Sequence, residues 1–308
     1  MSAERARANA VARPPVADLA WLGVAVLAIS TSGPVIAACA APALAIALWR
    51  CVLGAGATAP FVAWRRRGEV ASLTRREWRL ALVSGLLLGA HLATWVPSLR
   101  FTSVASATAL VATQPVWAVV IARMRGAVVR PKVWVGIAIA LAGVLVVTGI
   151  DVSREPRALV GDGLALAGAV FMAINVTVGQ EVRQSVSTAT YTTISYGSSG
   201  VALLVLCVAL QVPLGGYSAR DWWLILGLTA IAQLVGHTLI NRVLATTPAT
   251  VTSLAILLEV PGATLIAAWW LGEVPPLVVL PGIVLLFAGL TLVILAGDRR
   301  LATEAPPI

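Results

Sequence analysis

Two charged residues lie inside long apolar stretches of the sequence. Arg50 interrupts the stretch 43–64, and Glu259 interrupts the stretch 249–270. A charged side chain at the centre of a membrane-spanning helix costs about 2.5–3.5 kcal/mol, so such residues usually mark a substrate or ion pathway. Glu259 would anchor a substrate ammonium group or exchange a proton, and the planar guanidinium of Arg50 would hold a substrate carboxylate.

Each of these two residues also has a structural interpretation. Glu259 would then be a protonated carboxyl group bonded to a neighbouring helix. Arg50 would extend its side chain to the membrane surface or hold a helix-end carbonyl group. The sequence alone leaves both interpretations open.

A stripe of polar and aromatic residues occurs twice at helical spacing. His91, Trp95 and Ser98 are spaced i, i+4 and i+7, so they share one face of a helix. His237 and Asn241 repeat the first two positions 146 residues later. The stripe predicts either the polar lining of a central cavity, with Trp95 as an aromatic wall, or hydrogen bonds between helices. Scaffold contacts recur in both halves of a duplicated protein, which favours the second interpretation for the histidines.

Two prolines lie near the middle of apolar stretches, Pro115 in 103–122 and Pro261 in 249–270. Proline removes one helical hydrogen bond, so both positions predict a kink that would expose carbonyl groups toward a cavity. Gln114 precedes the first proline and is a candidate for the same lining. Further polar candidates within apolar stretches are Asn175, Gln180 and Gln233.

These residues belong to an internal duplication. A shift of 146 positions superposes residues 91–147 on 237–293 without a gap, and most of the paired positions are apolar in both. The shift brings the two histidines together and the two prolines together. It also pairs Gly126 with Gly272, Gly136 with Gly282 and Gly143 with Gly289. Such self-similarity predicts two structural repeats.

The composition is that of a polytopic membrane protein. Hydrophobic residues make up 59% of the 308 residues and charged residues 11%, whereas a soluble domain carries about a quarter charged residues. The apolar residues fall into long uninterrupted runs, which exclude the alternating strands of a membrane β-barrel. The sequence predicts an all-α integral membrane protein with ten transmembrane helices. The predicted helices are 18–37, 43–64, 80–97, 103–122, 133–150, 163–180, 191–210, 222–241, 249–270 and 277–296.

Most lysines and arginines fall in alternate connections, which predicts that both termini are cytoplasmic. Five helices per half is an odd number, so the halves form an inverted-topology repeat with the substrate site at their interface. The predicted organisation is a cytoplasmic arm (1–17), a first repeat (18–150), an external linker (151–162), a second repeat (163–296) and a cytoplasmic tail (297–308).

Several function classes lack support in the sequence. The net charge of +9 comes from arginines in short runs between apolar segments, which is not the pattern of a nucleic-acid-binding face. No phosphate-binding GxxxxGK[ST] loop, HExxH motif or GxSxG motif is present. The three cysteines have no metal-binding or disulfide spacing. We therefore expect no cofactor, no metal ion and no catalytic residue.

Five short stretches match a known family pattern. They are Arg50 after Ala45-Ile46-Ala47-Leu48-Trp49, the stretch 95–105, Gln114-Pro115, Leu258-Glu259-Val260-Pro261 and Leu271-Gly272-Glu273. Through them the chain resembles the drug/metabolite transporter superfamily, with two EamA-type domains over about 18–296. The pattern differs here at Ala127, where the family often has glutamate, and at Val260, which separates Glu259 from Pro261. The resemblance implies transport of small organic solutes, such as amino acids and related metabolites.

We predict a secondary transporter that exports a small organic solute, an amino acid or related metabolite, across the cytoplasmic membrane by alternating access. Glu259 is the candidate for proton coupling. The alternatives are a polytopic receptor or assembly factor and, with less support, a membrane-embedded enzyme. The expected partners are the solute and the lipid bilayer, and the chain is a monomer or a homodimer.

Overall fold

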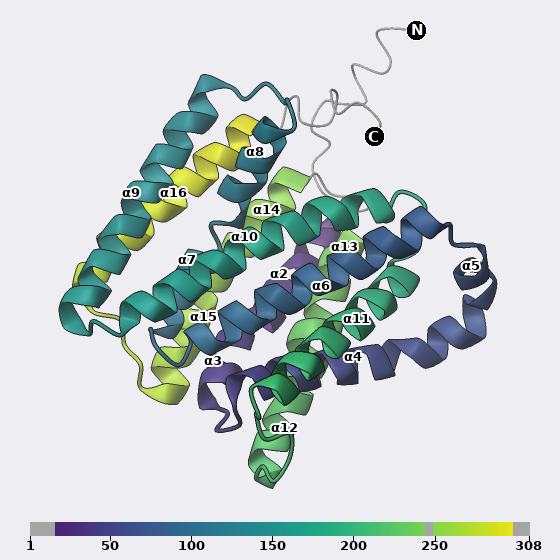
Figure 1. Ribbon diagram of the computed structural model, residues 1–308. Helices are drawn as coiled ribbons and strands as arrows, with labels where there is room; N and C mark the ends of the chain where they lie inside the picture. The colour runs from purple at the N-terminus through teal and green to yellow at the C-terminus, as the bar shows by residue number, and fades with distance from the viewer. Residues whose placement is uncertain (1–15, 244–248, 298–308) are drawn as a thin grey trace, which may run out of the picture.

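The computed structural model describes residues 16–243 and 249–297. Within these ranges every regular element is helical, and ten helical segments are long and apolar enough to cross a membrane. This confirms the predicted fold class. The predicted arm and tail lie almost wholly outside the described residues. The spans pack side by side as one bundle (Figure 1).

Five spans make up the first half. They are α2 (Val16–Ser30) with α3 (Ser32–Ala38), α4 (Ala43–Arg65), α6 (Arg75–Ser98), α7 (Val104–Val111) with α8 (Gln114–Met124), and α9 (Pro131–Arg154). A short helix, α5 (Arg67–Ser72), connects α4 to α6. α6 begins before the predicted residue 80 because Thr74 and Glu77 form a capping box that stabilises a charged first turn.

Five further spans make up the second half. They are α10 (Ala158–Val182), α11 (Thr188–Ala209), α12 (Ala219–Gly227) continued by η1 (Leu228–His237) and α13 (Thr238–Val243), α14 (Ala249–Leu257) with α15 (Glu259–Leu271), and α16 (Leu280–Gly297) after the 3-10 turn η2 (Leu277–Val279). Ten residues of the eighth span, η1, form a π-helix. The equivalent part of α6 is a regular α-helix, and π-helical turns occur most often at functional sites.

The two halves end their fourth spans in the same way. Gly126 follows α8 with φ +96°, and its equivalent, Gly272, follows α15 with φ +69°. Both lie in the left-handed region that favours glycine, so the repeated glycine is required by the same turn in each half. The register read from the sequence therefore holds in the backbone.

The crossing of α9 and α16 shows the two-fold relation directly. A Cβ on Gly136 would lie 2.9 Å from the carbonyl oxygen of Gly289, and a Cβ on Gly143 would lie 2.7 Å from that of Gly282. Each glycine meets the register equivalent of the other, as a two-fold axis between antiparallel helices requires. With five spans per half, the repeats therefore have opposite orientation in the membrane, as predicted.

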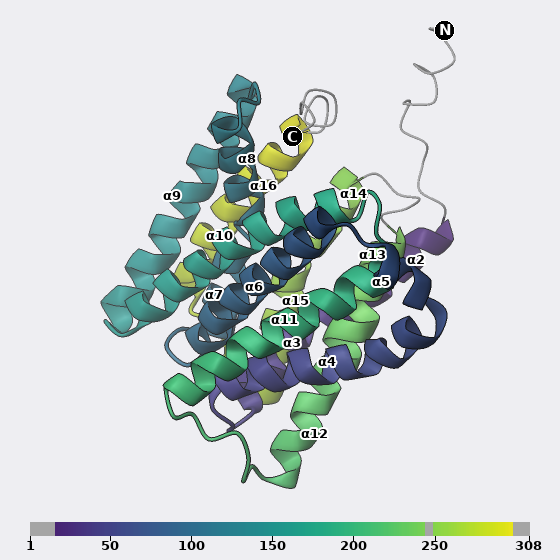
Figure 2. The same ribbon diagram turned by 45° about the vertical axis from the view of Figure 1, so that its right-hand side comes forward.

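The other helix pairs follow the same axis. α4 packs along its equivalent α11, while α6 packs against α10 and α11, and α2 packs against η1 and α15. Figure 2 shows α4, α6 and α11 side by side, with α9 and α16 at the far edge of the bundle. Leu145, Leu265 and Val284 are 73%, 70% and 64% exposed. An outer surface with such side chains belongs in hydrocarbon rather than in water.

The spans end at two faces, named here by their charge. The arginine-rich face carries the connections 65–75, 124–131 and 182–188, which hold most of the lysines and arginines of the connections. The opposite face carries the connections 38–43, 98–104, 154–158, 209–219 and 271–277.

Candidate functional site

A buried arginine joins the two repeats near the middle of the bundle. The Arg50 side chain on α4 is 4% exposed, and its Nε donates a hydrogen bond of 2.8 Å to Oε1 of Gln233 on η1. In return, Nε2 of Gln233 donates a hydrogen bond of 3.2 Å to the carbonyl oxygen of Arg50. The Nη1 atom of Arg50 is buried and has no hydrogen-bond partner among the described residues. The guanidinium is thus held on one edge and has a free donor on another.

The Arg50–Gln233 pair depends on a glycine one helical turn away. A Cβ on Gly54 would lie 2.2 Å from Nε2 of Gln233 and 3.0 Å from Cδ2 of Tyr196. Tyr196 lies on α11, and it is the register equivalent of Arg50 in the second repeat. The tyrosine interacts electrostatically with the guanidinium. Tyr196 was not a candidate in the sequence, because the duplication was described only for residues 91–147 and 237–293. The same shift of 146 positions, extended to Arg50, points to Tyr196.

Glu259 lies where the ninth span is interrupted. α14 ends at Leu257, and α15 begins at Glu259, which is half-buried. Glu259 interacts electrostatically with Arg50 but forms no ion pair with it in the described part of the chain. The backbone carbonyl of Glu259 accepts a hydrogen bond of 3.4 Å from Ser30 Oγ of the first repeat. The carboxyl group therefore stands at the repeat interface with its side chain partly accessible.

Both broken spans place a proline just after the break. The break in the fourth span is at Ala112 and Thr113, before Pro115, and the break in the ninth is at Leu258, before Pro261. Each proline falls in the first turn of the second segment, where its missing N–H leaves no helical bond unmade. The positive ends of α8 and α15 consequently lie inside the membrane-spanning region. An acidic side chain at the start of α15 is favourable in that field.

The two histidines have different environments. His91 is buried, its Nδ1 lies 3.0 Å from the carbonyl oxygen of Gly168 on α10, and its ring stacks on Trp95 at a centroid distance of 5.7 Å. His237 is the last residue of η1 and is half-buried. Arg50 interacts electrostatically with both rings. The contact of His91 is a hydrogen bond between repeats, while His237 keeps an accessible ring.

The other candidates differ in whether their polar groups already have a hydrogen-bond partner. The indole N–H of Trp95 is buried without a partner among the described residues, and Gln114 is half-buried at the start of α8. Ser98 instead donates to the carbonyl oxygen of Trp95 within its own helix, at 2.6 Å. Asn175 donates to Ser84 of α6 at 2.6 and 2.9 Å, which joins two helices, and Gln180 is exposed. The side chain of Asn241 lies outside the described residues.

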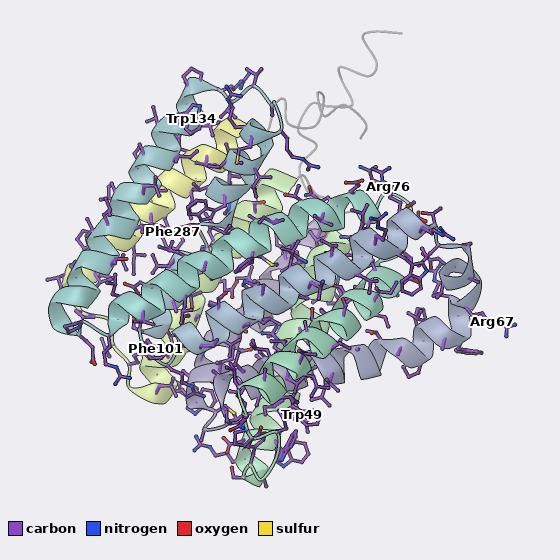
Figure 3. The ribbon with its side chains drawn as sticks, viewed as in Figure 1. Trp49, Arg67, Arg76, Phe101, Trp134 and Phe287 are labelled. Atoms are coloured by element: carbon purple, nitrogen blue, oxygen red, sulfur yellow. The ribbon has the colours of Figure 1, made fainter. Side chains whose placement is uncertain are left out.

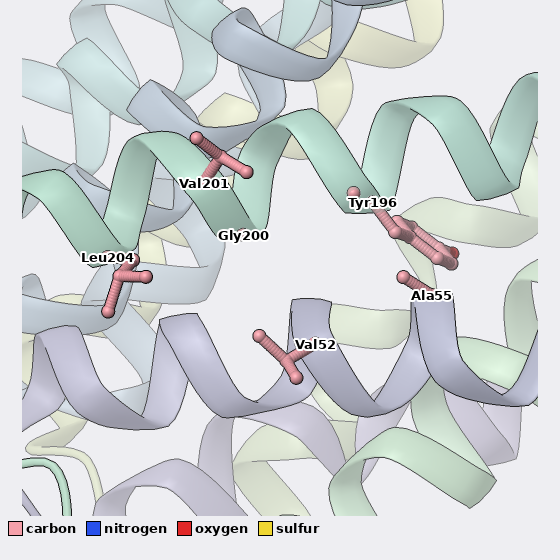
Figure 4. A pocket seen from close by; sticks show the side chains of 7 residues that line it. Val52, Ala55, Tyr196, Gly200, Val201 and Leu204 are labelled. Atoms are coloured by element: carbon pink, nitrogen blue, oxygen red, sulfur yellow. The ribbon is translucent and has the colours of Figure 1, made fainter.

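An apolar groove of about 200 Å³ lies on the other side of Tyr196 (Figure 4). Its lining comes from α4 and α11 and consists of Val52, Ala55, Tyr196, Gly197, Gly200, Val201 and Leu204. Val201 is 64% exposed and Leu204 42%, so the groove opens toward the lipid-facing surface. Tyr196 lines this groove, and its ring also lies beside Gly54 next to Gln233.

Polar contacts join the repeats at the opposite face of the bundle. The backbone N–H of Ala40 donates to Oδ1 of Asp221 at 2.7 Å, and that of Val104 donates to Oε1 of Glu273 at 2.6 Å. A third contact on this face lies within the first repeat, where Arg100 donates to the carbonyl oxygen of Ala41 at 3.0 Å. Carboxylates of the second repeat thus hold backbone groups of the first repeat on this face.

Known proteins resemble both halves of the chain. The model of the EamA-like transporter family matches residues 17–149 and 159–295, one match in each repeat. One crystal structure, described only as that of a protein, aligns with a TM-score of 0.63 at 18% sequence identity and covers 93% of this chain and 99% of that chain. At this identity the likeness shows the fold alone. No curated protein matches the chain.

Proposed function

Since the chain belongs to the EamA-like transporter family, as its two matched halves show, we propose that it is a secondary transporter of a small organic solute. The solute is an amino acid or a related metabolite, exported through the cytoplasmic membrane by alternating access. The arginine-rich face is cytoplasmic in this proposal, and both termini lie on that side.

The observation that carries the proposal is that Arg50 and Glu259, one from each repeat, both lie at the repeat interface. The two residues come from different repeats and lie inside membrane-spanning segments. They interact electrostatically without an ion pair between them. A solute with a carboxylate and an ammonium group would use both side chains. Its carboxylate would bind the free edge of the Arg50 guanidinium, and its ammonium group would bind the carboxyl group of Glu259.

The broken spans provide the moving parts. The fourth and ninth spans are hinged at equivalent positions, and the polar contacts of Asp221 and Glu273 close the opposite face. Opening that face requires these contacts between repeats to break while the central site stays in place. No nucleotide-binding loop is present in the sequence, so the energy comes from a gradient, with Glu259 as the proposed proton carrier.

The test is solute counterflow in liposomes with the purified protein, using labelled pools of amino acids, nucleosides, sugars and polyamines. We expect one pool to accumulate, and Glu259→Gln to abolish this accumulation or its dependence on pH. Glu155→Gln is the matched control, since Glu155 is exposed in the connection between the repeats. Wild-type rates and an unchanged pH profile in Glu259→Gln would reject the role of this carboxyl group.

Orientation is tested separately. The predicted linker 151–162 is helical except for residues 155–157, so the first topology reporter is inserted there. It should lie outside the cell, and a reporter placed after Arg300 should lie inside. Opposite results for both reporters would reverse the proposed orientation and leave the ten-span fold unchanged. Two reporters on the same side of the membrane would contradict five spans in the second half, and with them the inverted repeat.

A further inference from the structure

We propose that the ends of α4, α5 and α6 form a binding surface for the head groups of anionic phospholipids. We define this lipid surface as Arg65, Arg67, Arg75 and Arg79. It is independent of solute transport, and only its assignment to the cytoplasmic leaflet rests on the proposed orientation.

The acidic residues around this surface are already engaged by other groups. Glu69 accepts hydrogen bonds from the hydroxyl groups of Ser187 and Thr190, at 2.8 and 2.9 Å. Glu77 accepts a hydrogen bond of 2.8 Å from the backbone N–H of Thr74. Glu181 pairs with Arg76. In the described part of the chain none of these acids forms an ion pair with an arginine of the lipid surface.

The four arginines of the lipid surface remain available. All four are exposed, and none forms an ion pair or hydrogen bond with another described residue. Two of them, Arg75 and Arg79, are spaced i and i+4 and so lie on one face of α6. Figure 1 shows α5 between the ends of α4 and α6, and Figure 3 shows Arg67 projecting away from the bundle. Several unpaired positive charges are thus concentrated at the end of the membrane-spanning region.

Aromatic side chains at the same end of α4 match the chemistry of a lipid interface. Trp64 is 72% exposed and Phe61 49%. The guanidinium of Arg65 stacks on the indole of Trp64 at 4.1 Å from the ring centroid. Indole rings favour the boundary between head groups and hydrocarbon, so the stacked guanidinium is held at the level of the phosphates. A cluster of four to eight basic residues beside a spanning helix is typical of binding to anionic lipids.

A second basic connection on the same face provides a matched comparison. Its cations are Arg123, Arg125, Arg130 and Lys132, all exposed. No aromatic residue lies between positions 121 and 133. Four cations are replaced in each connection, and of the two sets only the lipid surface has, among the described residues, a cation stacked on an aromatic ring. If replacing the two sets of cations changes lipid affinity unequally, the lipid surface is a specific binding site. Equal changes would indicate only the general positive charge of this face.

The experiment is a titration of the full chain in detergent with phosphatidylglycerol or phosphatidylcholine of identical acyl chains, read by native mass spectrometry. Each arginine near an anionic lipid contributes about fivefold in affinity, before screening by salt. We expect the wild-type protein to favour phosphatidylglycerol at least tenfold. Replacing the four arginines with Gln should remove that preference, while the same change at the four cations of 123–132 should leave it within about threefold.

Three results would overturn the proposal. They are no preference for phosphatidylglycerol in the wild type, equal losses in the two four-residue variants, and full displacement of the lipid by equimolar glycerol phosphate, which would indicate a site for free phosphate. If the first variant does not insert or fold, the pairs Arg65/Arg67→Gln and Arg75/Arg79→Gln replace it. Each double variant keeps four arginines in 65–79, and its affinity for phosphatidylglycerol should fall at least threefold. No loss of affinity in either double variant would reject the lipid surface.

Discussion

The two repeats are alike where helices pack and different where charges meet. Gly143 and Gly289, which are register equivalents, both bring backbones into contact at the α9–α16 crossing. At the centre, however, Arg50 of the first repeat is matched by Tyr196, and Glu259 of the second is matched by Thr113. The packing is therefore duplicated, whereas each central charge is present only once.

This difference has a physical reason. Close packing of two backbones depends on side-chain volume, which acts in the same way on both sides of a two-fold axis. The proposed solute, an amino acid or related metabolite, has no two-fold symmetry, so a site that binds both its ends would need different groups from the two repeats. The eighth span adds two further differences from its counterpart. Its segment η1 is a π-helix, and Gln233 stands where the equivalent position of the first repeat has Leu87 and bonds to Arg50.

The largest effect is expected from the symmetric part. In Gly143→Leu and Gly289→Leu the new Cβ would meet backbone atoms at 2.5 and 2.3 Å, so each variant should lose about 3 kcal/mol or more of stability. Gly149→Leu on the same helix is the control, because a Cβ there meets nothing within 4 Å. Size-exclusion profiles of the solubilised variants check this. A folded Gly289→Leu beside an unfolded Gly143→Leu would break the symmetry argument.

The second largest effect is expected on transport, from replacing Arg50, which has no charged equivalent in the other repeat. Arg50→Gln removes a buried, charge-assisted contact and should lower kcat/KM in the counterflow assay about 100-fold. Tyr196→Phe, at the equivalent position, should lower it less than fivefold, because it removes only a neutral hydroxyl group. Equal losses in the two variants would mean that the repeats contribute alike to the site. Arg50→Lys keeps the charge without the planar fork and should fall between them.

A smaller effect, on stability, is expected when Gln233 is replaced by leucine, the residue at the equivalent position 87. Gln233→Leu leaves the Nε of Arg50 buried without its bond, which costs about 1–3 kcal/mol of stability. The control is Gln180→Leu, since Gln180 is exposed. Chemical or thermal unfolding in detergent measures both variants. A stability of Gln233→Leu equal to that of the wild type would show that this pair does not hold the repeats together.

The smallest effect concerns the contact of Glu69 with α11 at the arginine-rich face. Partial burial alone would raise the pKa of Glu69, but hydrogen bonds from Ser187 and Thr190 outweigh it and hold the pKa below its ordinary value. The folded state therefore favours the carboxylate, and the stabilisation is present above the unfolded pKa and lost as the pH falls through the folded pKa.

Glu69→Gln should accordingly lower the melting temperature near neutral pH by an amount that corresponds to about 1 kcal/mol. The difference from the wild type should shrink as the pH falls below about 4. Glu155→Gln serves as the control. A difference that stays constant down to pH 3 would show that the carboxylate form is not what stabilises the contact.

Much of the fold was predictable because it depends on quantities that are local in the sequence. Span length and apolar composition predicted ten helices, and the odd number per half predicted the inversion. The kink predicted at Pro115 and Pro261 stays a prediction, and the structure shows a break in each span about one turn before the proline. The start of α6 was missed because the capping box of Thr74 and Glu77 extends a helix beyond its apolar part.

The candidate site was only partly accessible from sequence. Arg50 and Glu259 could be selected because a charge in an apolar stretch is costly wherever it points. Ser98 was selected by its spacing, but its hydroxyl bonds within its own helix. Asn175 was a lining candidate, yet its amide joins α10 to α6. Whether a polar group is satisfied depends on its neighbours in three dimensions, which spacing does not report.

By itself the sequence determined the ten spans and the two intramembrane charges, because both follow from the cost of placing polar groups in hydrocarbon. It also determined the duplication, because the two halves remain similar at a fixed shift of 146 positions. Only the tertiary structure decided which groups meet. It paired Arg50 with Gln233, placed Tyr196 beside Gly54 and in the lining of the apolar groove, and left Glu259 partly accessible at a helix break. These contacts join residues more than 140 positions apart, and they depend on how the two repeats pack across their axis.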